Sequence, residues 1–405
     1  MRKAAKQLIA LCLGAWGLVY GQTESRTSLI EAARTEKEAN LTPETEPKLE
    51  RKIVSIENSR PYRLITGESG GLSVGFGNVM PGAGFAAGPQ YTRTGLWKGR
   101  LNFSVEARAS SNESYVGRTD VSLTNLFGDR VSLDFSAAHR NISEMAYYGA
   151  GPDSRKTGRS NYRLEDTNVE LRPAFRVYKG LRSGLIGSYL ANNVGPGHSS
   201  QFISSERQFA ANTTPGIDRQ TNFWRGGGFV EYDWRDDNSY PRSGGKYSAQ
   251  YVRYLDKTLG AYSFLRLDLD AAHYFPMFNG TRVFSVHGSS SLTSAGNGQL
   301  VPFYLQPTLG GANTLRGYRF NRFYGDNSVM VNGEYRWFCT PTLDMAAFVD
   351  AGKVFQRWEQ WNFHKLQSDV GFSVRFKTRT ARPAFSLDTG FSHEGFQIWF
   401  RVNTL

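Results

Sequence analysis

The side chains best suited to chemistry are few and scattered along this 405-residue chain. Its six histidines fall in no HExxH motif, and no paired-carboxylate motif is present, although metalloproteases and glycosidases need such spacings. They are His139, His198, His273, His287, His364 and His393. Cys12 lies in an N-terminal apolar segment, which leaves Cys339 alone, so we expect no disulfide and no cysteine-based zinc site. The sequence therefore predicts no enzyme, no cofactor and no metal site.

The densest group of conspicuous residues is the segment 309–337, LGGANTLRGYRFNRFYGDNSVMVNGEYRW. We expect a loop that begins near Pro307 and returns into a strand at Ser328. At its tip it presents Leu315, Arg316, Gly317 and Tyr318.

Carboxylates follow this loop on the next two predicted strands. In the strand from Ser328, Val329 and alternate residues share one face, so Glu334 is expected on the other, polar face. In the following strand, 346–355, Asp350 is opposite in parity to Val349. The two acidic side chains therefore depend on strands to position them.

The strand signal is an alternation of apolar and polar residues that starts at about residue 61. It is clear at 101–109, 131–136, 265–271 and 370–377. A soluble β-sandwich would show the same alternation, but its strands run about 5–6 residues, whereas membrane strands need about 9–11. Several runs reach nine residues, which favours a membrane barrel.

Composition agrees with that fold class. Aromatic residues make up 14% of the chain and glycine contributes 43 residues, whereas mean hydropathy is −0.45 and no segment after residue 21 could form a spanning helix. Barrel strands face lipid with every second residue only, so their average hydropathy stays low. The prediction is an all-β, transmembrane antiparallel β-barrel over 61–405, with 16 strands at about 21 residues per strand and connection.

The N-terminus has the pattern of a secretory signal peptide at 1–21. Arg2, Lys3 and Lys6 precede an apolar run, and Gly21 provides a small residue at the cleavage site. A lipoprotein signal is disfavoured because bulky Leu11 precedes Cys12. Residues 22–60 are rich in Glu, Lys and Ala, and we expect a helical or disordered periplasmic arm there.

The net charge of +12 raises the question of nucleic acid. Lys and Arg are dispersed at alternate positions without a basic cluster or an RNA-binding motif. A cationic lumen, with loops that face anionic outer-membrane lipids, explains the charge better, and no nucleic-acid partner is expected.

The loop and the strands after it resemble the BamA/TamA family of the bacterial surface antigen superfamily. LRGY matches the tip of the family's inward-folded outer loop, and Glu334 in GEYRW and Asp350 in FVDAG match the acidic partners of its arginine. The stretches YYGAGPDS at 147–154 and YDWRDD to YPRSGG at 232–245 are also family-like, so the resemblance spans about residues 75–400. It implies that Arg316 contacts both carboxylates inside the lumen.

Physical chemistry supports that implied contact. A guanidinium in a confined lumen is costly unless it is paired, and its planar fork suits two carboxylates. Gly317 would give the tip backbone freedom to turn. The alternative is that Glu334, Arg336 and Asp350 are ordinary lumen charges and the loop is a plug.

A weak seam between the first and last strands is a further hypothesis. Glycines at 70–88 would weaken the first strand, and the alternative is that they serve bends of the barrel. The candidate seam residues are Gly82, Gly84, Gly88, Phe396, Ile398 and Phe400. The alternating apolar residues near the C-terminus also suit an outer-membrane targeting strand, although the chain ends on Leu405 rather than on an aromatic residue.

The resemblance implies insertion or translocation of polypeptides at the bacterial outer membrane. Its implied partners are unfolded outer-membrane or secreted polypeptides, besides the membrane lipids. Assembly factors of the family carry periplasmic POTRA domains, and 22–60 is too short for one, so we expect a POTRA-less member. The alternative is a passive pore or structural surface-antigen barrel without client-handling activity.

Overall fold

The computed structural model describes residues 31, 35–36, 71–79, 84–362, 364–377 and 383–402. By its internal contacts the chain divides into two units, Met1–Ser59 and Arg60–Leu405. In the first unit, the Thr35 hydroxyl donates to the Glu31 carbonyl at 2.7 Å, as in a helical turn. The predicted signal peptide, most of the predicted arm and Gly82 lie outside the described residues.

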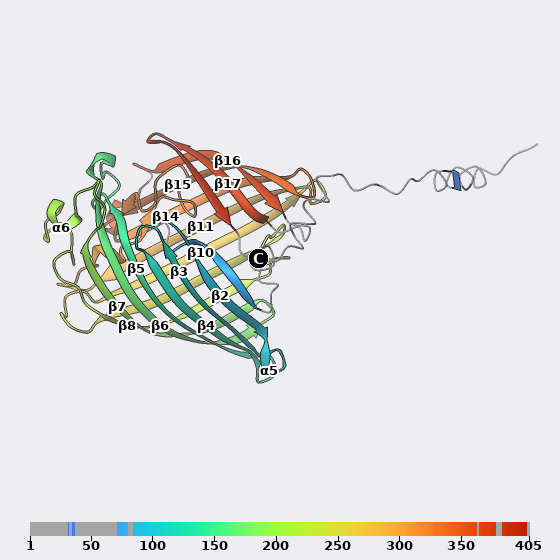
Figure 1. Cartoon of the computed structure of the whole chain (residues 1–405), viewed down its shortest axis with the longest axis horizontal. Helices are drawn as coiled ribbons and strands as arrows, with labels where there is room; N and C mark the ends of the chain where they lie inside the picture. Colours follow the sequence, from blue (N-terminus) through green and yellow to red (C-terminus); the bar gives the residue numbers. More distant parts are fainter. Residues whose placement is uncertain are drawn as a thin grey trace, which may run out of the picture. The chain divides into compact units, whose positions relative to one another are not determined.

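The second unit contains one 16-stranded sheet in which the strands follow chain order and each pairs antiparallel with its neighbours in the sheet (Figure 1). Its strands are β1 (Leu72–Asn78), β2 (Phe85–Gly95), β3 (Leu101–Ser110), β4 (Tyr115–Leu126), β5 (Val131–Tyr147), β6 (Ser160–Tyr178), β7 (Leu181–Pro196), β8 (Phe223–Asp233), β9 (Gly244–Asp256), β10 (Phe264–Met277), β11 (Arg282–Ala295), β14 (Asn327–Phe338), β15 (Leu343–Phe355), β16 (Gln367–Lys377), β17 (Pro383–Ser392) and β18 (Gly395–Val402). The sheet curls into a barrel, which confirms the predicted fold class and strand number.

The remaining elements of the described part of the barrel unit are short and belong to connections. They are α5 (Leu96–Gly99), α6 (Ser205–Gln208), η1 (Lys156–Gly158), η2 (Phe303–Leu305), η3 (Trp358–Gln360) and the two-stranded ladder of β12 (Thr308–Leu309) with β13 (Phe323–Tyr324). Within the described residues, no helix has the length and apolar character needed to cross a membrane.

The barrel is apolar outside and polar inside. In β16, Val370 and Phe372 are 57% and 46% exposed, whereas Ser373 and Arg375 are buried. A soluble sandwich would bury the apolar face instead. The inverted burial therefore separates the two architectures that alternation in the sequence left open, because a lipid-facing surface must be apolar.

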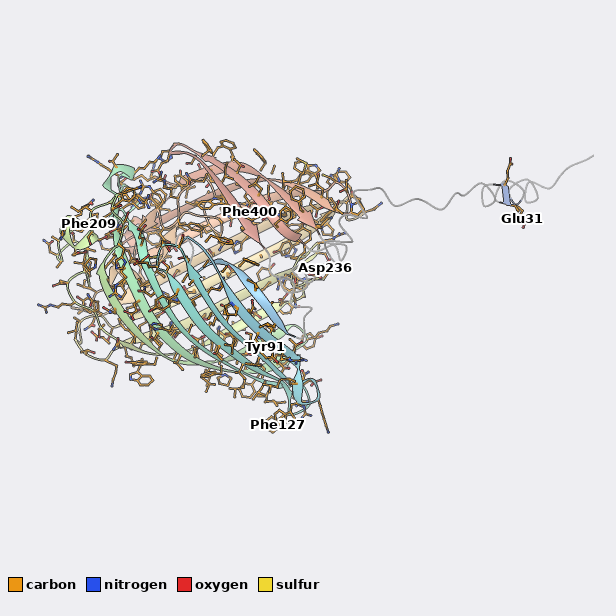
Figure 2. The ribbon with its side chains drawn as sticks, viewed as in Figure 1. Glu31, Tyr91, Phe127, Phe209, Asp236 and Phe400 are labelled. Carbon is orange, nitrogen blue, oxygen red and sulfur yellow. The ribbon has the colours of Figure 1, made fainter. Side chains whose placement is uncertain are left out.

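The two ends of the barrel carry different connections. Figure 2 shows Phe127 and Asp236, which belong to turns 127–130 and 234–243, at one end, and Phe209, in the loop 197–222, at the other. In outer-membrane barrels the short turns face the periplasm and the long loops face outward. We therefore call the end with Asp236 periplasmic and the end with Phe209 outer.

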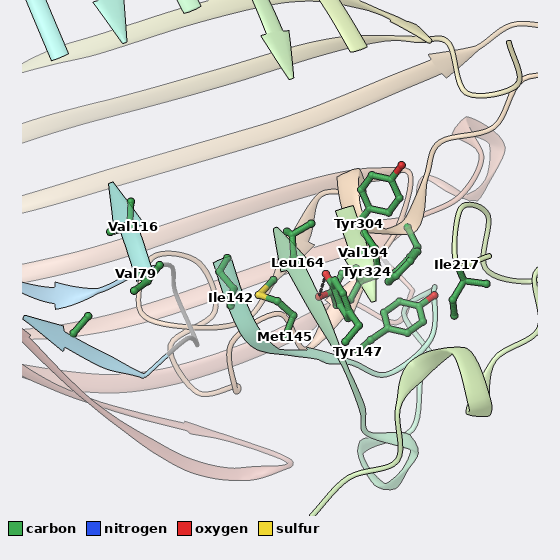
Figure 3. Close-up of a cluster of buried hydrophobic side chains, with 13 residues drawn as sticks. Val79, Val116, Ile142, Met145, Tyr147, Leu164, Val194, Ile217, Tyr304 and Tyr324 are labelled. Atoms are coloured by element: carbon green, nitrogen blue, oxygen red, sulfur yellow. Dashed lines mark hydrogen bonds between the residues drawn. The ribbon is translucent and has the colours of Figure 1, made fainter. Parts of the chain in front are cut away.

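An aromatic cluster fills the lumen near the outer end. The Tyr147 ring lies 5.1 Å from that of Phe303 and 4.9 Å from that of Tyr324, and Tyr162 lies 4.8 Å from Phe303. Figure 3 shows Tyr147 and Tyr324 grouped in this cluster, which joins β5 and β6 to the connection between β11 and β14. That connection, 296–326, is therefore fixed inside the barrel.

The glycine prediction needs a correction of position. The chain reverses between Asn78 and Phe85, which pair with each other, so Gly84 lies in the connection just before β2 and Gly88 lies in β2, and neither belongs to an edge strand. Gly88 pairs with Gly75, and a Cβ on Gly88 would collide with the Ala107 carbonyl of β3. A close approach between neighbouring strands thus accounts for Gly88.

The edges of the sheet are β1 and β18, and no ladder between them is formed by the described residues. Phe396, Ile398 and Phe400 lie in β18 with their side chains exposed on the outer surface. Gly75 and Gly77 are the glycines that lie in β1 itself.

Candidate functional site

The site is the tip of the connection 296–326, which we call the lumen loop. Its base is closed by the ladder of β12 with β13. Gly310 and Gly311 turn the chain with φ of 111° and 104°, a region that favours glycine. The Gly311 amide donates to the carbonyls of Leu315 and Tyr318 at 3.1 Å each, which makes the tip compact.

Arg316 is buried at this tip and makes a bidentate ion pair with Asp350. Its Nε lies 2.8 Å from Oδ2 and its Nη2 lies 2.6 Å from Oδ1. The backbone amide of Arg316 also donates to Asp350 Oδ2 at 3.1 Å, and Nη1 donates to Glu334 Oε2 at 2.9 Å. The structure thus brings together the three charged residues that the sequence singled out.

An aromatic ring completes the arginine site. The Arg316 guanidinium carbon lies 3.4 Å from the centre of the Phe348 ring on β15. Burial alone would lower the pKa of Arg316, but hydrogen bonds and charge from Asp350 and Glu334 outweigh it and raise that pKa above its ordinary value. The arginine therefore stays charged at physiological pH and can pair with both carboxylates.

Glu334 joins more than one arginine. Its Oε1 accepts from Arg336 Nε and from Arg375 Nη2, each at 2.7 Å, while Oε2 accepts from Arg316. Three guanidinium groups on one carboxylate, with Asp350 beside it, make an ionic cluster rather than a simple triad. Sequence reasoning missed the role of Arg375, although the alternation in β16 already placed it on the polar face.

Gly317 was predicted to let the tip backbone turn, but the structure gives a different reason for a glycine at this position. It is absent from the described glycines with positive φ, so the turn does not need it. A Cβ on Gly317 would lie 2.5 Å from the Cβ of Asp369. Glycine is required there because the tip backbone packs directly against β16.

Leu315 and Tyr318 are buried on either side of the arginine. Leu315 packs in a small apolar cluster with Leu309 and Met330. The Tyr318 hydroxyl donates to the Ser368 carbonyl at 3.2 Å and lies 3.0 Å from His393 Nδ1. Burial, with charge from Asp369 and Glu394, raises the pKa of Tyr318 to about 12, so the hydroxyl keeps its proton.

A periplasmic turn reaches the same cluster from the other end. Tyr240, in the turn 234–243, donates its hydroxyl proton to Asp344 Oδ2 at 2.9 Å. Arg336 Nη1 donates to the Pro241 carbonyl at 3.1 Å. Arg336 therefore contacts both Glu334 and the turn, so the lumen loop and the family-like YPRSGG segment meet at one group of charges.

A second ionic anchor lies nearer the outer end of the lumen loop. The buried Arg322 side chain donates to Glu394 in the turn between β17 and β18, and to Ser154 in the loop between β5 and β6. Ser154 closes the family-like segment 147–154. Two stretches noted in the sequence thus supply contacts that hold the loop.

Open space remains in the lumen beside the tip. A cavity of about 430 Å³ is lined by charged side chains that include Arg235, Lys246, Arg336 and Arg375. Within the described part of the chain, no group of three or more His, Cys, Asp or Glu side chains is placed to hold a metal ion. The chemistry of the site is ion pairing.

Comparison with known proteins agrees with this geometry. The Omp85 superfamily domain matches residues 98–394, which is most of the barrel. The chain belongs to the Omp85 superfamily. This confirms the family resemblance and makes the chain a bacterial outer-membrane barrel of the insertion and translocation type.

Solved Omp85 barrels share the fold at low sequence identity. BamA from Haemophilus ducreyi lacking POTRA domains 1–3 is similar with a TM-score of 0.61 and 14% identity, over 82% of this chain and 69% of that one. CdiB from Escherichia coli gives a TM-score of 0.52 and 13% identity, over 82% of this chain and 60% of that one. No curated protein matches by sequence.

Proposed function

We propose that this Omp85 barrel inserts or translocates polypeptide segments through a seam between β1 and β18, with the lumen loop holding the closed state. The observation that carries the proposal is the Arg316 cluster, because it fixes an outer loop deep inside the barrel. Such a buried network is stable only when every partner is present. Displacing the loop would therefore switch the barrel between discrete states.

The edges of the sheet support the seam. Within the described residues, β1 and β18 have 7 and 8 residues and are the shortest of the 16 strands. A strand with an unpaired edge offers its amide and carbonyl groups to another chain. An unfolded outer-membrane or secreted polypeptide, which has unpaired backbone groups, is the partner that this edge fits.

In this proposal the barrel changes the location of a polypeptide and catalyses no covalent reaction. The buried charged groups around Arg316 are engaged with one another and hold the loop. The role of Leu315, Arg316, Gly317, Tyr318, Glu334 and Asp350 is therefore regulatory.

Depletion of the protein from its host tests the proposal. Levels of other outer-membrane or secreted proteins should fall. Normal levels with altered permeability to small solutes would instead identify a passive barrel.

Disulfide locking is a sharper test of the seam. Cysteine pairs would be scanned between 72–77 and 396–401 in a Cys339→Ser background, because Cys339 is the exposed free cysteine of the described chain. A locked seam should abolish client handling, and reductant should restore it. As a matched control, cysteines at Val230 and Ala249, which face each other between β8 and β9, lock a ladder that is already closed.

A further inference from the structure

The last strand presents one large aromatic side chain to the lumen. Phe396, Ile398 and Phe400 are exposed to the outside, so alternation turns Trp399 inward. Its indole Nε1 donates to the Arg316 carbonyl at 2.7 Å, and its ring centre lies 4.4 Å from that of Phe320. The lumen loop thus contacts β18 through both a hydrogen bond and ring packing.

The preceding strand holds the same tip. The Ser392 hydroxyl donates to the Gly317 carbonyl at 2.9 Å. A Cβ on Gly390 would lie 2.5 Å from the carbonyl carbon of Arg316, so the backbones of the tip and of β17 are in direct contact. The terminal hairpin β17–β18 is therefore built around the loop tip.

Arg316 consequently links β14 and β15 to the last strand, β18. Its side chain binds Glu334 on β14 and Asp350 on β15, and its carbonyl binds Trp399 on β18. In the sheet order these strands run β14, β15, β16, β17 and β18. One residue bridges the width of five strands and ends on the strand that borders the seam.

We propose that Trp399 is a positioning residue that couples the lumen loop to the last strand, so that β18 leaves the closed position only when the loop tip is released. The consequence for client handling rests on the proposed function, whereas the coupling itself is a property of the barrel. β18 pairs with β17 on one side, and on the seam side the described residues give it no ladder. The tip contacts therefore add to the β17 ladder in holding this strand.

Hydrogen exchange of the purified full-length barrel, reconstituted in lipid nanodiscs, measures the coupling. Trp399→Phe keeps an aromatic ring against Phe320 and removes the indole donor. We expect exchange on the order of fivefold faster in both 310–322 and 396–401, as for the loss of one buried hydrogen bond. Phe400→Leu is the matched control on the same strand, and its lipid-facing change should alter neither segment.

The reciprocal variant separates coupling from local packing. The guanidinium of Arg316 binds β14 and β15, so Arg316→Ala removes no side-chain bond to β18. Faster exchange in 396–401 of this variant is the expected result. Glu334→Gln takes its place if Arg316→Ala fails to show the folded band in heat-shift gels. The coupling would be overturned if the folded Arg316 or Glu334 variant showed unchanged exchange in 396–401. It would also be overturned if Trp399→Phe raised exchange in 396–401 but not in 310–322.

The hydrogen-exchange result does not depend on whether the barrel inserts or translocates polypeptides. If exchange is coupled but depletion leaves other outer-membrane proteins at normal levels, the coupling stands and the insertion proposal fails. If depletion lowers those levels but the two segments exchange independently, the coupling fails and the insertion proposal stands.

Discussion

Arg322 of the lumen loop and Glu394 of the turn between β17 and β18 form a buried ion pair, with Arg322 Nη2 2.7 Å from Glu394 Oε1. The same guanidinium donates to the carbonyl and hydroxyl of Ser154 at 2.6 and 2.9 Å. Three outer connections that are far apart in the sequence therefore meet on one side chain. The pair is a second fixed point for the loop, separate from Arg316.

Arg322→Ala should loosen the outer end of the barrel. Removing one partner of a buried ion pair leaves the other charge without compensation and costs about 3–5 kcal/mol. Limited proteolysis of intact cells should show faster cleavage within 310–326, together with a lower unfolding temperature. Lys365→Ala is the control, because Lys365 and Asp153 form an exposed pair between outer connections. If Arg322→Ala and Lys365→Ala had equal effects, burial of the Arg322–Glu394 pair would not be what makes it stabilising.

Arg316→Ala should destabilise the barrel and release the lumen loop. It leaves Asp350 and Glu334 buried, again at a cost of about 3–5 kcal/mol. Arg316→Lys should be intermediate, since an ammonium group cannot reproduce the bidentate contact. The measurements are heat resistance in gel-shift assays and protease resistance of the loop. If Arg316→Ala left both values unchanged, the interpretation that Arg316 holds the lumen loop inside the barrel would be wrong. Arg219→Ala is the control, because Arg219 is exposed and its loss should change neither value.

Tyr240→Phe should make the periplasmic end leakier. It removes the hydroxyl that bonds the Asp344 carboxylate, a loss of about 2 kcal/mol, and keeps the ring beside Phe338. Single-channel conductance in planar bilayers should show more frequent openings. Tyr247→Phe, which removes a hydroxyl bound to His273 in an exposed position, is the matched control. Identical conductance of wild type and Tyr240→Phe would exclude a closing role for the turn.

Asp236 should make the turn 234–243 sensitive to acid. Burial would raise its pKa, but the amides of Arg242, Ser243 and Asp237 donate to it and lower that pKa overall. A lowered folded-state pKa stabilises the turn above about pH 4, and this stabilisation is lost as pH falls through the folded-state value. The unfolding temperature of Asp236→Asn should therefore lie below that of wild type at pH 7, and the difference should shrink as the pH falls below about 4. If the difference in unfolding temperature between the two proteins did not change with pH, the charge of Asp236 would not be what stabilises the turn.

The candidate site was partly accessible from sequence. The LRGY tetrapeptide and the parity of Glu334 and Asp350 placed one basic and two acidic groups on lumen-facing positions. Arg375 carried the same parity signal, but nothing in the sequence shows which lumen charges meet. Tyr240 gave no such signal, because it lies in a turn, where alternation does not apply.

The roles of the glycines could not be predicted from the sequence for a different reason. A run of glycines indicated weak strands near residue 80, but the position of the chain reversal decides which strand receives each glycine. Gly88 is required by the close approach of β3, and Gly317 by that of β16. Close approaches between backbones depend on the curvature of the whole sheet.

By itself, the sequence determined the alternation of apolar and polar residues, and with it the strands and their two faces, and the strand lengths favoured a barrel over a sandwich. Those features are local, because residue i and residue i+2 share a face whatever the rest of the chain does. Tertiary structure alone decided that Trp399 and Ser392 hold the tip, that Arg322 meets Glu394, and that Tyr240 reaches Asp344. These pairs are separated by 72 to 104 residues along the chain, so their contact follows from the closing of the sheet and the path of the loop inside it.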